Sequence, residues 1–191
     1  QLTPGNSGLF FGAYENAQGI WGLSNQGLLR VNPSDGSLQL EAEGTIGAPN
    51  QNLIKNIDDR LYSFTSDNTS SSSTDARHWS TPAKLPGSNG LAYDMQQVGD
   101  TLLLVYSSDF YFSTNKGQTW SIMPDSFDNA GSLAIQNGVL LIGDQKGVWR
   151  ANHVQGPWTK VLPAYWVTAV LTTPDKWYAI LYDGSLYTST D

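Results

Sequence analysis

The 191-residue chain contains no cysteine. That absence excludes a disulfide framework, zinc sites with thiolate ligands and cysteine nucleophiles. Charged residues make up only 14% of the chain, and its ten lysines and arginines are scattered, with a net charge of −7. A nucleic-acid-binding surface needs a basic cluster, so we expect no nucleic-acid partner. No segment approaches the roughly eighteen consecutive apolar residues of a membrane-spanning helix, so we expect no membrane insertion.

Glycine and aromatic residues, by contrast, are frequent. The chain has 19 glycines, 12% aromatic residues and 39% hydrophobic residues. This hydrophobic content is sufficient for a core, and the mixture with serine, asparagine and threonine is typical of β-strands joined by many turns. No window shows the sustained periodicity of an amphipathic helix. The composition therefore predicts an all-β protein.

Three sets of residues recur along the chain at intervals of about 40 residues, which indicates an internal repeat. The first set is Leu38, Trp79, Trp120 and Trp158. The second set is Ile20-Trp21, Leu61-Tyr62, Leu103-Leu104, Leu140-Leu141 and Tyr178-Ala179. The third set is Leu29-Arg30, Tyr111-Phe112, Trp149-Arg150 and Leu186-Tyr187. Because three independent sets share one period, chance is a poor explanation.

Each repeat contains four short segments with the composition of β-strands. In the third repeat these are residues 90–99, 100–108, 109–115 and 119–124, separated by glycine, aspartate and asparagine as hairpin turns require. Four strands in about 40 residues are the signature of a β-propeller blade. A β-sandwich does not require equal spacing and is the weaker alternative. In the second repeat, we interpret the serine run 70–73 as a flexible loop that widens the blade.

We therefore predict a single β-propeller domain over residues 1–191, built from four-stranded antiparallel blades. Five blades are expected, at about residues 8–44, 45–88, 89–128, 129–164 and 165–191. The last blade would be completed by an N-terminal strand at residues 1–5, which would remove an exposed sheet edge. The alternative is a fragment of a six- to eight-bladed propeller. An open edge could also pair with another chain, so self-association is a further expectation.

The segment STNKGQTW, residues 113–120, resembles the Asp-box, a BNR-type turn written S-x-D-x-G-x-x-W. Ser113, Gly117 and Trp120 match, and Asn115 stands where the family has aspartate. Residues 73–79 and 189–191 are similar to partial copies. The resemblance implies repeats like those of sialidase-like, xyloglucanase-like and sortilin-like propellers. It also implies that the turn is mainly structural and lies at the periphery of the blade.

Catalytic residues are not visible in the sequence. By resemblance, a sialidase would need three arginines around a carboxylate, but the only arginines are Arg30, Arg60, Arg77 and Arg150, in positions that do not suit this role. Other glycosidases need two carboxylates about 5–10 Å apart, and no such pair can be identified. We expect no catalytic site. The alternative is a portion of a carbohydrate-active hydrolase whose carboxylates lie partly outside this chain.

Metal and cofactor sites are not expected either. His78 and His153 are the only histidines, and neither has ligand spacing to another histidine or to a carboxylate. We interpret both as residues of surface turns, and we predict no metal and no cofactor.

The best candidate site is a set of turn residues between the second and third strands of the repeats. They are Asn25, Asp67, Asp109, Asp144 and Asp183. Asparagine and aspartate are favoured in such turns, which is the simpler interpretation. In a propeller these turns share one face with the connections between blades. The alternative is therefore a polar, ligand-binding rim with Phe127, Tyr165 and Trp166 as stacking surfaces.

From these residues we predict a non-catalytic binding or interaction module that presents its inter-blade loops to a glycan or protein ligand. The chain begins at Gln1 rather than methionine, and a removed signal peptide is one interpretation of that start. We therefore expect a secreted, periplasmic or cell-surface location.

Overall fold

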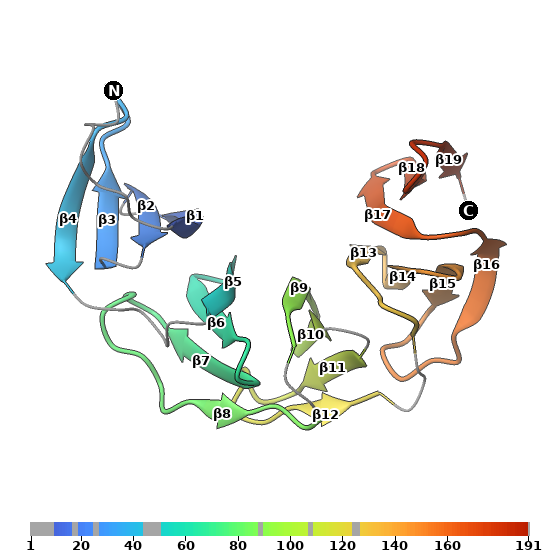
Figure 1. Cartoon of the computed structure of the whole chain (residues 1–191), viewed down its shortest axis with the longest axis horizontal. Coiled ribbons are helices and arrows are strands. Elements are labelled where there is room, and N and C mark those ends of the chain that lie inside the picture. The colour runs from blue at the N-terminus through green and yellow to red at the C-terminus, as the bar shows by residue number, and fades with distance from the viewer. Residues whose placement is uncertain are drawn as a thin grey trace. The chain divides into compact units, whose positions relative to one another are not determined.

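The computed structural model describes residues 10–16, 19–24, 27–43, 51–87, 90–106, 109–123 and 127–190. Within these ranges the regular elements are β-strands. The described residues contain no helix that is long and apolar enough to cross a membrane. The chain divides into two compact units, Gln1–Lys84 and Leu85–Asp191, which are described separately. Figure 1 shows the strands of both units.

The first unit contains two four-stranded sheets. Sheet 1 consists of β1 (Phe10–Asn16), β2 (Gly19–Ser24), β3 (Gly27–Val31) and β4 (Leu38–Glu43). Sheet 2 consists of β5 (Gln51–Ile57), β6 (Arg60–Thr65), β7 (Thr69–Ser73) and β8 (Ala83–Lys84). Within each of these sheets, every strand pairs antiparallel with the next strand along the chain. Short polar turns favour this arrangement.

The second unit continues the same pattern with three sheets. Sheet 3 consists of β9 (Ala92–Val98), β10 (Thr101–Tyr106), β11 (Asp109–Ser113) and β12 (Ser121–Ile122). Sheet 4 consists of β13 (Ser132–Gln136), β14 (Val139–Asp144), β15 (Gly147–Ala151) and β16 (Thr159–Pro163). Sheet 5 consists of β17 (Val167–Thr173), β18 (Lys176–Leu181) and β19 (Leu186–Ser189). The predicted four-strand repeat is therefore confirmed at the level of the sheets.

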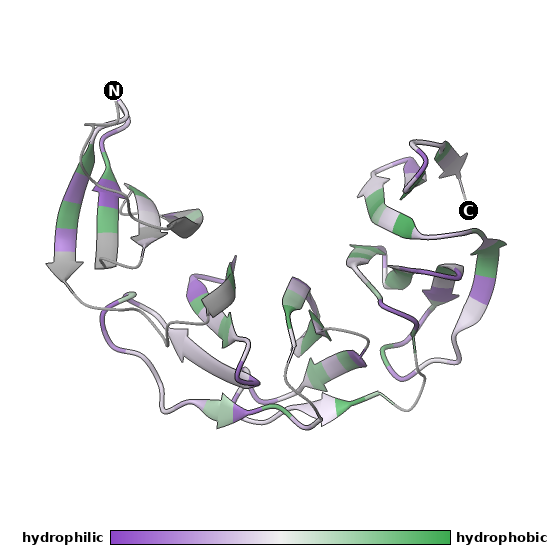
Figure 2. Cartoon of the chain, viewed as in Figure 1, coloured by the Kyte–Doolittle hydropathy of each residue, from purple (hydrophilic) through white to green (hydrophobic). Residues whose placement is uncertain are grey.

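In sheets 2 to 4 the second strand is the most buried strand, and the fourth strand is the most exposed. In β10, every residue from Leu102 to Tyr106 is buried, whereas both residues of β12 are exposed. The outer strand β4 alternates hydrophobic and hydrophilic residues along its length (Figure 2). Leu38 and Leu40 of this strand are nonetheless exposed, at 36% and 42%, so the core does not cover the leucine face of β4.

The core of the second unit lies between successive sheets. Leu103 and Val105 of β10 pack against Leu140 and Ile142 of β14. Because successive side chains of a strand point to opposite faces, the intervening Leu141 belongs instead to the cluster between sheets 4 and 5. Sheet 4 is thus covered on both faces by its neighbours, which explains why its second strand is hydrophobic without alternation.

Two of the recurring tryptophans fill spaces between sheets. The Trp158 ring packs edge to face against Phe110 and Phe127, with ring centroids 6.0 and 5.2 Å apart. In the first unit, Trp79 packs against the cluster that contains Trp21 and Leu61. Each indole precedes the fourth strand of its own sheet and contacts the preceding sheet, so the period of the tryptophans reflects a repeated packing position.

The turn that resembles an Asp-box is closed by side-chain hydrogen bonds. The Ser113 hydroxyl donates to Asn115 Oδ1 at 2.9 Å and accepts from the Gly117 amide at 2.9 Å. Asn115 Oδ1 also accepts from the Thr119 amide at 2.9 Å. Gly117 has a φ of 78°, a left-handed conformation that glycine adopts at low cost. The arrangement holds the outer hairpin of sheet 3.

The turn at residues 73–79 reaches a similar arrangement without a glycine. Asp75 Oδ1 accepts from the Ser73 hydroxyl at 3.1 Å and from the amides of Arg77 and His78 at 2.9 and 2.8 Å. Ala76 takes the left-handed conformation, with a φ of 58°. The His78 ring also lies 2.6 Å from Asp75 Oδ2, a contact three residues apart that the sequence analysis did not anticipate.

The interpretation of the serine run as a loop is wrong. Residues 69–73 form β7, the third strand of sheet 2, and pair with β6 from Leu61 to Thr65. Ser70 and Ser73 are buried. The third strand of this sheet lacks the aromatic and aliphatic residues of its counterparts, so hydrophobicity alone did not identify it, but its small side chains fit between covered faces.

Candidate binding surface

Four of the five predicted turn residues lie within the described part of the chain, and Asn25 lies outside it. Two of the other four lie between the second and third strands of their sheets, one begins the third strand of sheet 3, and one ends the second strand of sheet 4. The four residues are Asp67, Asp109, Asp144 and Asp183. Their surroundings differ strongly, so the set is not a uniform rim of exposed carboxylates.

Asp144 is a buried structural residue. It is only 1% exposed, and its carboxylate accepts three hydrogen bonds. Oδ1 accepts from the Lys146 amide at 2.7 Å. Oδ2 accepts from the Asp128 amide at 3.1 Å and from the Trp149 indole at 2.9 Å. One carboxylate thus joins the turn of sheet 4, its third strand and the connection from sheet 3.

Asp183 and Asp109 have simpler roles. The exposed Asp183 accepts a hydrogen bond from the Ser185 amide at 2.9 Å, which lowers the pKa of the Asp183 carboxyl. Asp109 accepts from the Tyr111 hydroxyl at 3.2 Å, and the same hydroxyl donates to the Pro86 carbonyl at 2.8 Å. Burial, followed by the nearby Asp109 charge, raises the pKa of Tyr111. Tyr111 is therefore neutral at physiological pH.

Asp67 also lies on an exposed turn. Its backbone carbonyl accepts a hydrogen bond from the Lys84 ammonium at 2.7 Å. The contact links the turn to the end of the fourth strand of the same sheet.

The turn of sheet 4 shares one face with the connections on both sides of it. The Gln145 amide donates to the Asp128 carbonyl at 2.8 Å, in the connection from sheet 3. The Gln145 carbonyl accepts from the Trp166 amide at 3.0 Å, in the connection to sheet 5. The Lys146 ammonium forms an ion pair with Asp128 at 2.9 Å, which raises the pKa of Lys146. Turn and connections form one hydrogen-bonded surface, which we call the turn face.

Phe127 is not an exposed stacking surface. It is 3% exposed and packs edge to face against Phe110, Trp149 and Trp158 in the core between sheets 3 and 4. A phenylalanine in a connection between strands was expected to face solvent. It is buried because the rings of Phe110, Trp149 and Trp158 cover it.

Tyr165 and Trp166 are exposed, and the structure adds a third ring that sequence reasoning missed. Tyr165 is 76% exposed, Trp166 is 40% exposed and Tyr182 is 74% exposed. The Trp166 ring centroid lies 6.3 Å from that of Tyr165 and 5.8 Å from that of Tyr182. Tyr182 directly precedes Asp183 in the predicted set, which was the available signal. We call these three residues the aromatic cluster.

The backbone of Trp166 is fixed in an unusual conformation. Its φ is 52°, in the left-handed region that bulky residues rarely adopt. Its amide donates to Gln145, and its carbonyl accepts from the Tyr182 amide at 2.9 Å. These bonds tie the connection to the turns of sheets 4 and 5 and hold the indole at the surface. Strained positions of this kind occur often at functional sites.

No group of three or more histidine, aspartate or glutamate residues that could hold a metal ion occurs among the described residues. The contact of His78 with Asp75 and the ion pair of Lys146 with Asp128 lie at two separate turns.

No protein-family model matches the chain, and no curated protein matches it. Three solved structures illustrate what it is similar to, and all three are β-propeller proteins. The extracellular domain of BT4673 from B. thetaiotaomicron is 12% identical over 100% of this chain and 27% of that domain, with a TM-score of 0.75. Streptogramin B lyase is 12% identical over 94% of this chain and 68% of the lyase, with a TM-score of 0.64.

YCF48 from Cyanidioschyzon merolae is 13% identical over 96% of this chain and 67% of YCF48, again with a TM-score of 0.64. The chain thus spans about a quarter of the length of the first structure and about two thirds of the other two. At these identities the likeness establishes the fold. Together with the repeated antiparallel sheets, it shows that this chain has a β-propeller fold.

Proposed function

We propose that the chain is a non-catalytic binding module that holds a glycan or protein ligand on its turn face, at the aromatic cluster. The observation that carries this proposal is the exposure of three neighbouring rings, those of Tyr165, Trp166 and Tyr182. Burial of a large aromatic side chain stabilises a protein by roughly 1.5–3 kcal/mol. Three adjacent rings remain exposed here and do not contribute this stabilisation. Exposed patches of this kind are typical of surfaces that a ligand covers.

The chemistry of the cluster suits a ligand that combines apolar faces with hydroxyl or amide groups. The rings offer flat stacking surfaces, and tyrosine and tryptophan are enriched where proteins bind partners. The exposed Asp183 follows Tyr182 directly, and its carboxyl is ionised near neutral pH, as is usual for aspartate. It can accept hydrogen bonds from sugar hydroxyls or peptide amides. The left-handed Trp166 backbone supports a preorganised site, because two hydrogen bonds hold it before any ligand arrives.

The setting that we propose is outside the cytoplasm: secreted, periplasmic or at the cell surface. The absence of cysteine is compatible with this setting. One of the similar structures is described as an extracellular domain, which supports the same location by analogy of fold.

A glycan array and a peptide array, probed with the labelled 191-residue chain, test the function. We expect binding by the wild type and at least a tenfold loss with Trp166→Ala or Tyr182→Ala. Tyr93→Ala is the matched control, because Tyr93 is an exposed aromatic residue of β9, away from the cluster. Circular dichroism and the melting temperature show whether each variant is folded. Absence of ligands for the wild type, or ligands retained by both cluster variants, would refute the proposal.

A further inference from the structure

The second unit carries more negative than positive charge. Residues 85–191 contain nine aspartates, no glutamate and five lysines and arginines. An excess of this kind attracts cationic ligands and repels anionic ones. If a ligand binds the aromatic cluster, as the proposed function requires, charge complementarity therefore favours a cation.

The aromatic cluster combines two features that suit a cation. The face of an aromatic ring is electronegative, and it attracts a cation that lies within about 6 Å of the ring centroid. The centroids of Tyr165 and Tyr182 lie 6.3 and 5.8 Å from that of Trp166, so one cation can reach two rings at once. The exposed carboxylate of Asp183, next to Tyr182 along the chain, adds a full negative charge.

Asp183 pairs with no lysine or arginine of the described residues. Its carboxylate accepts a hydrogen bond from the Ser185 amide at 2.9 Å. Lys146, in the turn of sheet 4, is held by Asp128 at 2.9 Å. Lys176 begins β18, whereas Asp183 follows the other end of that strand. The charge of Asp183 is thus available to a ligand.

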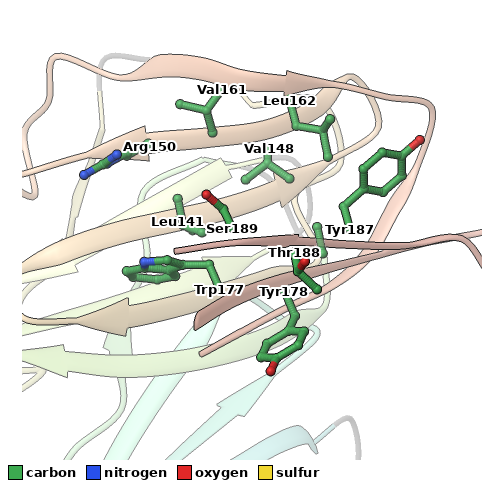
Figure 3. A pocket seen from close by; sticks show the side chains of 11 residues that line it. Leu141, Val148, Arg150, Val161, Leu162, Trp177, Tyr178, Tyr187, Thr188 and Ser189 are labelled. Atoms are coloured by element: carbon green, nitrogen blue, oxygen red, sulfur yellow. The ribbon is translucent and has the colours of Figure 1, made fainter. Parts of the chain in front are cut away.

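The remaining basic residues of the second unit lie elsewhere. Arg150 lines a pocket of about 310 Å³ between sheets 4 and 5, together with Trp177 (Figure 3). The lining of this pocket includes no residue of the aromatic cluster. Lys116 lies in the Asp-box-like turn of sheet 3, and Lys160 lies over the ring of Trp149. No cation of the described chain therefore compensates the charge beside the aromatic cluster.

The chain itself places cations over indole rings at two other positions. The Arg30 guanidinium lies 5.6 Å from the ring centroid of Trp21, and the Lys160 ammonium lies 4.6 Å from that of Trp149. Within the described ranges no cation lies over Trp166, although this residue is 40% exposed. The exposed indole thus lacks the kind of partner that the other two have.

We infer that the aromatic cluster binds an arginine side chain of a partner polypeptide, an inference that rests on the proposed function. The guanidinium stacks on Trp166 and one neighbouring ring, and its N–H groups donate to the carboxylate of Asp183. Arginine suits this surface better than lysine, because its guanidinium is planar, is weakly hydrated and presents several donors in one plane. A neutral glycan can use the rings but gains nothing from the excess negative charge.

A nuclear magnetic resonance titration of the 191-residue chain, labelled with ¹⁵N in its indoles, tests the inference. The probe is the capped tripeptide acetyl-Gly-Arg-Gly-amide, and its matched control carries citrulline, which has nearly the same shape but no charge. The Trp166 signal is identified by its loss in Trp166→Phe. We expect a saturable shift of this signal with the arginine peptide and at least fivefold weaker binding of the citrulline peptide. Equal affinities, or no saturable shift, would overturn the inference.

Two charge variants locate the binding. Asp183→Asn removes the charge beside the aromatic cluster and keeps an acceptor for the Ser185 amide. Asp175→Asn removes the same charge from an exposed residue that precedes β18, so about 20 Å of strand separates the two positions. We expect at least threefold weaker binding of the arginine peptide by Asp183→Asn and less than a 1.5-fold change by Asp175→Asn. Equal effects would assign the attraction to net charge alone and would refute the site.

A lysine tripeptide tests the choice of cation. We expect it to bind at least twofold more weakly than the arginine peptide, and equal or tighter binding would overturn the assignment to arginine. Failure of this inference is distinguishable from failure of the proposed function. A glycan or neutral peptide that the arrays identify and that Trp166→Ala loses would exclude arginine and retain the aromatic cluster as a binding surface. Absence of every ligand, the arginine peptide included, would overturn both.

Discussion

Substitution of Asp144 and Asp183 provides a direct comparison between two members of the predicted turn set: Asp144 is the last residue of β14, and Asp183 lies in the turn that follows β18. Asp144 is buried and accepts hydrogen bonds from two backbone amides and from the Trp149 indole. Asp183 is exposed and accepts one such bond from a backbone amide. If the sequence position alone determined the contribution, the two alanine variants would lose similar stability. If burial determines it, Asp144→Ala is far more damaging.

The expected magnitude for Asp144→Ala follows from the donors that it leaves behind. A buried donor without a partner costs roughly 1–3 kcal/mol. The indole of Trp149 lies against the core, whereas the amides of Asp128 and Lys146 lie near the surface and regain water in part. We therefore expect a loss of about 2–4 kcal/mol in the free energy of unfolding. Asp144→Asn keeps one acceptor oxygen and should lie between the wild type and Asp144→Ala.

Urea unfolding followed by far-ultraviolet circular dichroism measures the difference. With an m-value of about 2 kcal/mol/M, the midpoint of Asp144→Ala should fall by about 1–2 M. Asp183→Ala should leave the midpoint close to that of the wild type, because water can accept the hydrogen bond of the exposed Ser185 amide in place of the carboxylate. Equal shifts in the two variants, or an unchanged midpoint for Asp144→Ala, would refute the view that Asp144 holds the turn of sheet 4, β15 and the connection from sheet 3 together.

Two further predictions concern other turns. Gly147→Ala should cost at least about 3 kcal/mol or prevent folding, because Gly147 has a φ of 137° and a Cβ there would lie 2.0 Å from the Leu162 carbonyl oxygen. Gly138→Ala is the control in open space and should cost only about 1–2 kcal/mol, measured by the same urea unfolding. The hydrogen bond from the His78 side chain is the largest cause of the lowered pKa of Asp75, so the stabilisation by Asp75 is present above about pH 4 and is lost as the pH falls further. The stability difference between the wild type and Asp75→Asn should therefore shrink from pH 5 to pH 3, and a difference that grows would contradict this assignment.

The repeat was predictable because its signal is distributed over many residues. Each sheet needs a hydrophobic second strand and turns at nearly fixed intervals, so the period survives even where single positions vary. The third strand of sheet 2 was missed because Thr69–Ser73 retains the position of its counterparts but not their hydrophobicity. Its assignment depends on pairing with β6, a long-range contact that composition does not report.

The candidate binding surface was less predictable, because the exposure of a ring depends on which neighbour covers it. Phe127 and Tyr165 both lie in connections between sheets, yet the first is buried under Trp158 and the second is almost uncovered. The sequence places Tyr182 beside Asp183, but the contact of its ring with Trp166 appears only where the turn of sheet 5 reaches the preceding connection. Sequence position therefore selected the candidate turns and connections, and packing decided which of their rings are exposed.

The different placement of Asp144 and Asp183 in sheets 4 and 5 shows how a repeat can carry a local candidate site. In sheet 4 the carboxylate of Asp144 turns inward, and its three hydrogen bonds join the connection from sheet 3, the turn of sheet 4 and β15. The adjacent Gln145 carbonyl accepts from the Trp166 amide, in the connection to sheet 5. In sheet 5, Asp183 remains at the surface next to Tyr182. The buried acid thus stabilises the surface on which the exposed acid and its neighbouring rings are displayed, so loss of Asp144 should weaken ligand binding without any contact to the ligand.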